Sequence, residues 1–144
     1  MYEIVKKKSP FMKIIAGIAI LFIITSVLKM FLKEPDLSVD KELLLISNEI
    51  NKRAPITVDS ITRLDNVQAL TGKRLQYNYT ITNTDKDQID TSILKSNTRQ
   101  NMSNMIKTNP KAKYFRDNKI EIVVSYVDQK GVYVCNLTIP STDY

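Results

Sequence analysis

Residues 119–140 read KIEIVVSYVDQKGVYVCNLTIP and carry the strongest local pattern in the chain. Two β-rich runs flank residues 128–131, where Gly131 suits a hairpin loop that needs positive φ. Pro140 closes the second run because it cannot donate a ladder hydrogen bond. Alternation then predicts one shared face on each strand: Ile120, Ile122, Val124 and Tyr126 on the first, and Tyr133, Cys135, Leu137 and Ile139 on the return.

Two more β segments precede this hairpin. In RLQYNYTIT, residues 74–82, apolar and polar residues alternate regularly, which predicts an antiparallel strand with one solvent-exposed face. Its apolar side is Leu75, Tyr77, Tyr79 and Ile81, and its polar side is Gln76, Asn78, Thr80 and Thr82. Residues 56–70 are rich in β-branched side chains and predict a single irregular strand, followed by a turn at Thr71-Gly72.

Two helical patterns separate these segments. Residues 37–54 carry an apolar stripe of Val39, Leu43, Ile46 and Ile50, which Leu44 and Leu45 widen. Ser38 or Asp40 can cap this helix, and Pro55 marks its end. A second helix is predicted from Ile89, Ile93, Leu94, Met102, Met105 and Ile106, ending at Asn109-Pro110. The sequence therefore predicts an α+β domain at residues 38–140 with the element order αββαββ. We expect an antiparallel four-stranded sheet with two helices on one face. A short C-terminal tail follows at residues 141–144.

The N-terminal part has a different character. Residues 11–32 are almost wholly apolar and would span about 33 Å as a helix, close to the thickness of a bilayer's hydrocarbon core. A buried core helix is disfavoured because the run is apolar on every face. A cleaved signal peptide is disfavoured because no small-residue cleavage pattern follows. We therefore expect an uncleaved transmembrane signal-anchor at 11–32, after a short cytoplasmic tail at 1–10 and before a linker at 33–37.

Charge and composition narrow the function classes. The net charge is +6, but residues 1–32 hold five lysines and one acid, whereas the remaining chain holds sixteen basic and fourteen acidic residues. The basic excess thus flanks the apolar run, which favours membrane orientation over nucleic-acid binding. We expect the N-terminus in the cytoplasm and the domain outside the inner membrane, in the periplasm or extracellular space.

Catalytic residue types are scarce. The chain has no histidine and one cysteine, Cys135, so histidine-dependent catalysis and an intramolecular disulfide are excluded. Only three glycines are present, and no phosphate-cradling loop is recognisable. We expect no catalytic residues, no metal site and no cofactor. Cys135 is interpreted as a small buried hydrophobe.

Five residues are candidates for partner binding. Asp59, Arg63 and Asp65 would point one way along a single strand, so two carboxylates and a guanidinium could share a surface. Their plainer interpretation is a solvated salt-bridge network. Tyr77 and Tyr79, with Tyr126 and Tyr133, either pack in the sheet core or form an aromatic binding platform.

PITVDSITRLDNVQA (55–69), LQYNYTI (75–81) and VVSYVDQKGVYV (123–134) together resemble a family of small exported bacterial proteins of unknown function. The residues that carry this resemblance are Pro55, Asp59, Thr62, Arg63, Leu64, Asp65, Val67, Tyr77, Tyr79, Tyr126 and Gly131. The resemblance implies an extracytoplasmic α+β domain and no known chemistry. Members of such families often carry paired cysteines, which this chain lacks.

Three functions are compatible with these observations. The first is a membrane-tethered, non-enzymatic binding or accessory protein of the bacterial envelope, with the lipid bilayer and other envelope proteins as partners. The second is a periplasmic immunity or inhibitor protein that neutralises a secreted toxin. The third is a hydrolase that uses acids alone, for which Asp59 and Asp65 would be the candidate acids.

Overall fold

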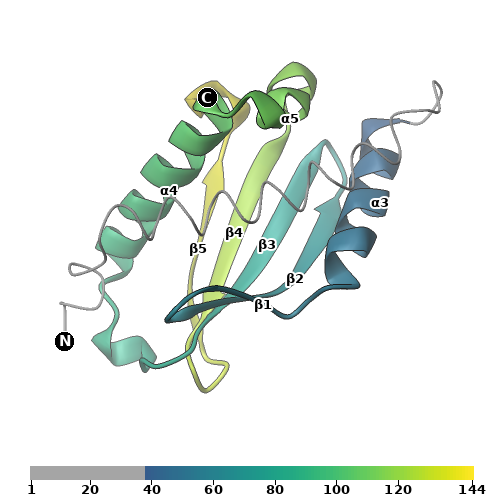
Figure 1. The fold of residues 1–144 in the computed structure, drawn as a ribbon. Helices are drawn as coiled ribbons and strands as arrows, with labels where there is room; N and C mark the ends of the chain where they lie inside the picture. Colours follow the sequence, from purple (N-terminus) through teal and green to yellow (C-terminus); the bar gives the residue numbers. More distant parts are fainter. Residues whose placement is uncertain (1–37) are drawn as a thin grey trace.

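The computed structural model describes residues 38–144 (Figure 1). The predicted tail at 1–10, membrane span at 11–32 and linker at 33–37 lie outside these residues. Within the described part, no helix is both long enough and apolar enough to cross a membrane. The α-helices are α3 (Val39–Asn51), α4 (Thr91–Thr108) and α5 (Lys113–Asn118). The strands are β1 (Ile56–Asp59), β2 (Thr62–Leu70), β3 (Arg74–Ile81), β4 (Glu121–Val127) and β5 (Tyr133–Ile139).

The sheet is five-stranded and mixed, with strand order β1-β2-β3-β4-β5. β3 and β4 pair in parallel, and every other pair is antiparallel. The prediction of a four-stranded antiparallel sheet is therefore wrong on both counts, although the α+β class is confirmed. The parallel pair arises because α4 carries the chain back along the sheet between β3 and β4, so both strands start at the same end.

The extra strand comes from the segment predicted as one irregular strand. The chain turns at residues 60–61, so Ile56–Asp59 folds back on Thr62–Leu70 and Asp59 pairs with Thr62. The Asp59 carboxylate supports this turn by accepting a hydrogen bond from the Ile61 amide at 2.9 Å. Partial alternation in the sequence did not distinguish one long strand from two short ones.

Helix α3 packs over β2 through the predicted stripe, of which Leu43, Ile46 and Ile50 are buried. Ser38 is its N-cap but makes no side-chain capping hydrogen bond. At the other end, the Asn51 amide binds the Val67 backbone in both directions: Nδ2 donates to the carbonyl and Oδ1 accepts from the N–H, each at 2.8 Å. This paired contact fixes the helix end against a central residue of β2.

Helix α4 begins at an Asp90 cap, whose carboxylate accepts from the Ser92 and Ile93 amides at 3.0 Å. It ends at Thr108, before Asn109 and Pro110, as predicted. The short helices that follow, η2 (Pro110–Ala112) and α5, were not predicted. α5 ends at Asn118 and is capped by Lys119, which has the left-handed conformation, and Phe115 of this helix enters the core.

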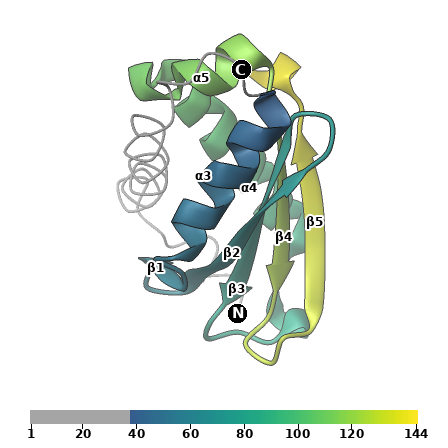
Figure 2. The same ribbon diagram turned by 90° about the vertical axis from the view of Figure 1, so that its right-hand side faces the viewer.

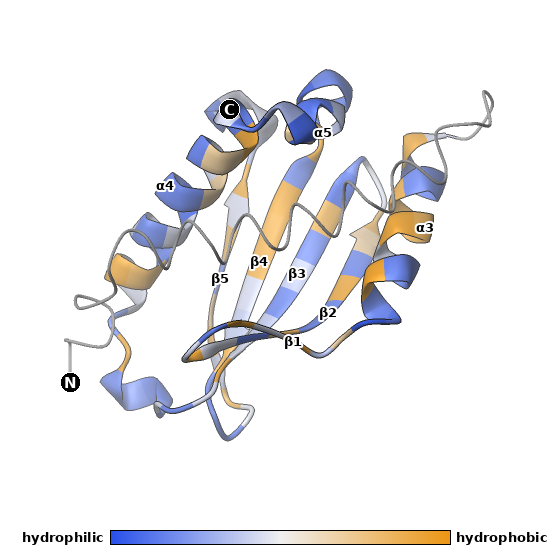
Figure 3. Ribbon diagram, viewed as in Figure 1, coloured by the Kyte–Doolittle hydropathy of each residue, from blue (hydrophilic) through white to orange (hydrophobic). Residues whose placement is uncertain are grey.

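Both long helices lie on one side of the sheet (Figure 2). Hydrophobic and hydrophilic residues alternate along β2 and β3 (Figure 3), so the same strands supply a buried face under the helices and a polar face on the other side. The core joins the inward residues of all three helices and of β2 to β5 in one cluster.

The β4–β5 hairpin was predicted correctly in position. Gly131 has φ of 78°, and the Asp128 carboxylate accepts backbone hydrogen bonds from Lys86, Lys130 and Val132 at 2.8–2.9 Å. Tyr133 differs from the prediction: it is 52% exposed instead of sharing the buried face. The register shifts between Tyr126 and Val127, so Tyr133 pairs with Val127, one position earlier than alternation requires.

Candidate functional site

The five predicted site residues fall on different sides of the sheet. Leu64 is fully buried, so its neighbours Arg63 and Asp65 point to the face that the helices leave uncovered. Tyr77 and Tyr79 point to the helix-covered face. Asp59 lies on β1, across the turn. The structure thus brings Arg63 and Asp65 together and separates them from the two tyrosines.

Arg63, Asp65 and Thr80 form a closed network on the uncovered face. Arg63 Nε lies 2.6 Å from Asp65 Oδ1, and the Thr80 hydroxyl donates to Asp65 Oδ2 at 2.5 Å. The Arg63 guanidinium also donates to Thr80 Oγ1 at 3.3 Å. Arg63 and Asp65 remain partly exposed while Thr80 is buried, so the network offers both charges to solvent from a fixed position.

The polar network continues along the sheet. Asn78 Nδ2 donates to Asn66 Oδ1 at 2.7 Å, and Gln76 Nε2 donates to Asn78 Oδ1 at 2.8 Å. The strand register extends the row from Asn78 to Ser125 and then to Asn136. We call this surface the open face, and define it by Arg63, Asp65, Asn66, Gln68, Gln76, Asn78, Thr80, Ser125, Asn136 and Thr138.

The sequence predicted part of the open face. The polar side of β3 was found from alternation alone, because β3 is regular. Asn66, Ser125 and Asn136 were missed as a group, since only the strand register shows that they form one row. Neighbour relations of this kind need the order of the strands, which periodicity does not supply.

The helix-covered face carries a row of stacked tyrosines. The Tyr77 and Tyr79 ring centroids lie 6.3 Å apart with planes at 9°, and Tyr79 and Tyr126 lie 5.5 Å apart at 25°. All three side chains are buried, which confirms the core-packing interpretation for them, and the exposure of Tyr133 contradicts it for that residue. A buried row of this kind is structural and does not form an accessible platform.

The tyrosine hydroxyls are held in their neutral form. The Tyr126 hydroxyl and Thr98 Oγ1 share a hydrogen bond of 2.9 Å inside the core. Burial raises the pKa of Tyr126 to about 12, against the opposing effect of the Thr98 hydrogen bond, and the charges of Cys135 and Asp59 raise it further. Burial also raises the pKa of Tyr79 well above its ordinary value, with smaller effects from Tyr126 and Tyr77.

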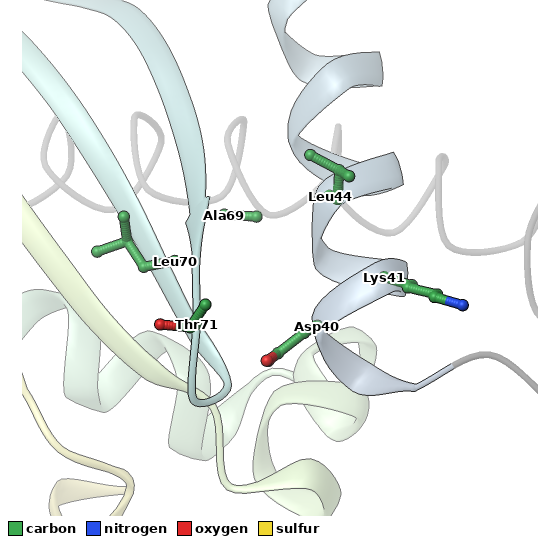
Figure 4. A pocket seen from close by; sticks show the side chains of 6 residues that line it. All are labelled: Asp40, Lys41, Leu44, Ala69, Leu70 and Thr71. Atoms are coloured by element: carbon green, nitrogen blue, oxygen red, sulfur yellow. The ribbon is translucent and has the colours of Figure 1, made fainter.

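A shallow pocket of about 260 Å³ lies between α3 and the end of β2 (Figure 4). Leu44, Ala69 and Leu70 supply its apolar wall, and the other lining residues are Asp40, Lys41 and Thr71. The Asp40 carboxylate accepts from the Lys73 amide at 2.7 Å and the Gly72 amide at 3.1 Å, and these two bonds lower its pKa. Asp40 therefore serves to fix the β2–β3 turn.

Groups suited to metal or nucleophilic chemistry are scarce. Among residues 38–144, no group of three or more histidine, cysteine, aspartate or glutamate side chains is placed to hold a metal ion. Cys135 is buried, and burial raises the pKa of its thiol, which disfavours the reactive thiolate.

In residues 38–144, the fold and the open face define a class: a small α+β domain with one sheet face covered by helices and a second, mostly polar face that these helices leave uncovered. The chain belongs to the family described as "Domain of unknown function (DUF8479)", whose model matches residues 39–134. This match confirms one part of the resemblance seen in the sequence, namely that the chain belongs to a family without an assigned function. Among curated proteins, no sequence matches the chain.

Solved structures with a similar fold exist. One is PA3611 of Pseudomonas aeruginosa, described as a candidate secreted protein, with a TM-score of 0.55 and 11% identity over 75% of this chain and 97% of that one. A second is AspS, a type II secretion system pilotin of Vibrio cholerae, with a TM-score of 0.53 and 10% identity over 74% and 95%. A third is EpsS, the pilotin of the Vibrio vulnificus type 2 secretion system, with a TM-score of 0.54 and 11% identity over 73% and 94%. At these identities the likeness concerns the fold alone.

Proposed function

We propose that this protein is a single-pass, membrane-anchored bacterial envelope protein whose domain lies outside the inner membrane and acts as a non-enzymatic binding or accessory module. The proposal rests on two observations taken together, the apolar run near the N-terminus and the fold of the domain that follows it. A long uncharged apolar run at 11–32 leads within a few residues into a fold that also occurs in a candidate secreted protein and in two secretion-system pilotins.

The open face is the surface that we assign to partner binding. Several of its amide, hydroxyl and charged side chains are held in place by hydrogen bonds within β3 and between β2 and β3, and none of the described helices covers them (Figure 2). A preorganised polar surface loses little side-chain entropy when a partner binds. Arg63 and Asp65 give it one charge of each sign, which favours a protein partner over nucleic acid.

A non-enzymatic role is supported by the residues present. The chain contains no histidine. The two carboxylates that we considered for acid-only hydrolysis serve the structure: Asp59 holds the β1–β2 turn, and Asp65 binds Arg63 and Thr80. Paired catalytic carboxylates need to face each other across a cleft, whereas Asp65 lies on the open face and the charge of Asp59 acts on Tyr126 of the helix-covered face.

The anchor is tested by extraction. Membranes from cells that express the full chain are washed with alkaline carbonate, and the N-terminus of the retained protein is determined. We expect the chain to stay in the membrane with its apolar run intact. Release into the wash, or a mature N-terminus after residue 32, would overturn the anchored topology.

The binding surface is tested by photo-crosslinking in intact cells. A photoreactive amino acid is placed at Gln68 or Asn136 on the open face, and at Asn48 or Gln100 on the exposed sides of the helices as matched controls. We expect a discrete cross-linked envelope protein from the first pair only. Cross-links from the helix positions alone would move the binding surface to the helices, and none from any position would contradict the binding role.

A further inference from the structure

We propose that the end of the domain at which α3 begins binds the surface of an anionic phospholipid bilayer. This inference rests on the proposed membrane anchor. Six exposed lysines from the start of α3, the β2–β3 turn, the end of α4, η2 and α5 make up this surface, which we call the basic end: Lys41, Lys73, Lys107, Lys111, Lys113 and Lys119.

Direct contacts bring these elements together. The Glu121 amide donates to the Lys73 carbonyl at 2.9 Å, which joins the start of β4 to the β2–β3 turn. The Tyr114 hydroxyl of α5 donates to Glu42 of α3. The start of α3, the β2–β3 turn and α5 lie at the same end of the molecule in both Figure 1 and Figure 2.

The elements of the basic end also carry four acidic residues, Asp40, Glu42, Asp117 and Glu121, against the six lysines. Asp40 accepts from two backbone amides, Glu42 from Tyr114, and Asp117 pairs with Lys113. Among residues 38–144, Lys41, Lys107 and Lys119 take part in no salt bridge. Hydrogen bonds leave the carboxylates charged, but the six lysines outnumber the four acids, so the basic end keeps a positive excess that can attract phosphate groups.

The opposite end of the domain has the contrary charge. The loops around η1 (Lys86–Gln88) and between β4 and β5 bring together the carboxylates of Asp85, Asp87, Asp90 and Asp128. They outnumber the lysines there, of which Lys130 is paired with Asp85 at 2.7 Å. An anionic surface would thus attract one end of the domain and repel the other.

The chain itself holds the basic end near the bilayer. α3 begins at Val39, seven positions after the end of the apolar run at residue 32. Even fully extended, those residues reach about 25 Å. At physiological salt, charges are screened beyond about 8 Å. The tether lets the basic end come within this distance of the bilayer, where its lysines are attracted to anionic headgroups. Each lysine near an anionic surface strengthens association by about five-fold.

The proposal is tested by lysine footprinting of the full chain in vesicles. The protein is reconstituted in phosphatidylcholine alone or mixed with phosphatidylglycerol, and a membrane-impermeant amine reagent labels outward-facing domains. Modification of each lysine is followed by mass spectrometry. We expect the basic-end lysines to react at least about five-fold more slowly in the anionic vesicles, since several act together. Lys52, Lys86 and Lys95 should react equally in both.

Two matched triple variants distinguish the effect of the charges at the basic end from the effect of the overall charge of the domain. Lys41→Gln, Lys107→Gln and Lys119→Gln together should abolish protection of the remaining basic-end lysines. Lys52→Gln, Lys86→Gln and Lys95→Gln together remove the same charge elsewhere and should leave protection unchanged. Equal labelling rates in the two vesicle types, or equal effects of the two triple variants, would overturn the lipid-binding surface.

Carbonate extraction of the same vesicles distinguishes the two proposals. A chain that stays in both vesicle types without lipid-dependent protection retains the proposed anchor and loses the basic-end proposal. A chain that is extracted from both loses the anchor and, with it, the tether on which the basic end depends.

Discussion

The two faces of the sheet are built from the same strands, yet different forces hold them. On the helix-covered face, Tyr77, Tyr79 and Tyr126 stack in a row and bury large apolar surfaces. On the open face, Asn66, Gln76 and Asn78 bind one another through side-chain amides. Burial dominates stability, whereas exposed polar networks contribute little to it. The comparison teaches that one face makes the fold, whereas the described helices leave the other uncovered, and this is the face that we propose for partner binding.

The largest expected effect comes from removing a buried ring. Tyr77→Ala should lower the free energy of unfolding by about 3–5 kcal/mol, because it deletes a fully buried aromatic side chain and leaves a cavity. Denaturant unfolding followed by circular dichroism measures the change. Tyr133→Ala is the matched control on the same sheet and should shift stability by less than about 0.5 kcal/mol. Similar losses for the two variants would show that burial on the helix-covered face does not dominate the stability of the domain.

A smaller loss is expected where the covered face meets its helix. Asn51→Ala leaves the Val67 N–H and carbonyl without their side-chain partner, which should cost about 1–3 kcal/mol. The same unfolding measurement applies, and Asn48→Ala on the exposed side of α3 is the control. Equal stability of Asn51→Ala and the unmodified chain would mean that water replaces the amide, and that α3 is held by its apolar stripe alone.

Alkaline pH should affect the covered face selectively. Because the pKa of Tyr126 is raised to about 12 in the folded state, its stabilising contribution is complete below its unfolded pKa near 10 and is lost as the pH rises through 12. At about pH 11 this loss amounts to roughly 1 kcal/mol for one tyrosine.

Unfolding midpoints between neutral pH and pH 11 measure this effect. Tyr126→Phe should flatten the decline, although it also removes the hydrogen bond to Thr98 and so starts from lower stability. Tyr133→Phe, which removes the hydroxyl of an exposed ring on β5, is the matched control. An identical pH slope in the Tyr126→Phe variant would show that other groups govern alkaline unfolding.

The smallest effect on stability is expected on the open face. Arg63→Ala removes one partly exposed ion pair and should change the free energy of unfolding by about 1 kcal/mol or less. The same substitution should weaken partner cross-linking from Asn136 in intact cells, since it alters the surface that we assign to binding. Lys95→Ala, on α4, is the control. A large loss of stability without a change in cross-linking would reverse the roles of the two faces.

Sequence patterns predicted the elements better than their arrangement. The stripe of α3, the end of α4 before Pro110 and the hairpin loop at residues 128–131 all depend on local geometry, so periodicity and turn chemistry sufficed. The short strand β1 and helix α5 were missed because each has only a few residues and no periodic repeat. Of the candidate site, the neighbours Arg63 and Asp65 were placed correctly together, while Asp59 was assigned to the wrong strand.

The sequence by itself determined which residues are buried on most of the strands, where the long helices lie and which catalytic residue types are missing. These properties follow from spacing and composition, which act over a few residues. Only the tertiary structure decided that β4 runs parallel to β3, that a register shift exposes Tyr133, and that the start of α3, the β2–β3 turn and α5 lie at one end of the domain. Each of these depends on how distant segments pair and pack, and long-range packing leaves no periodic trace in a single sequence.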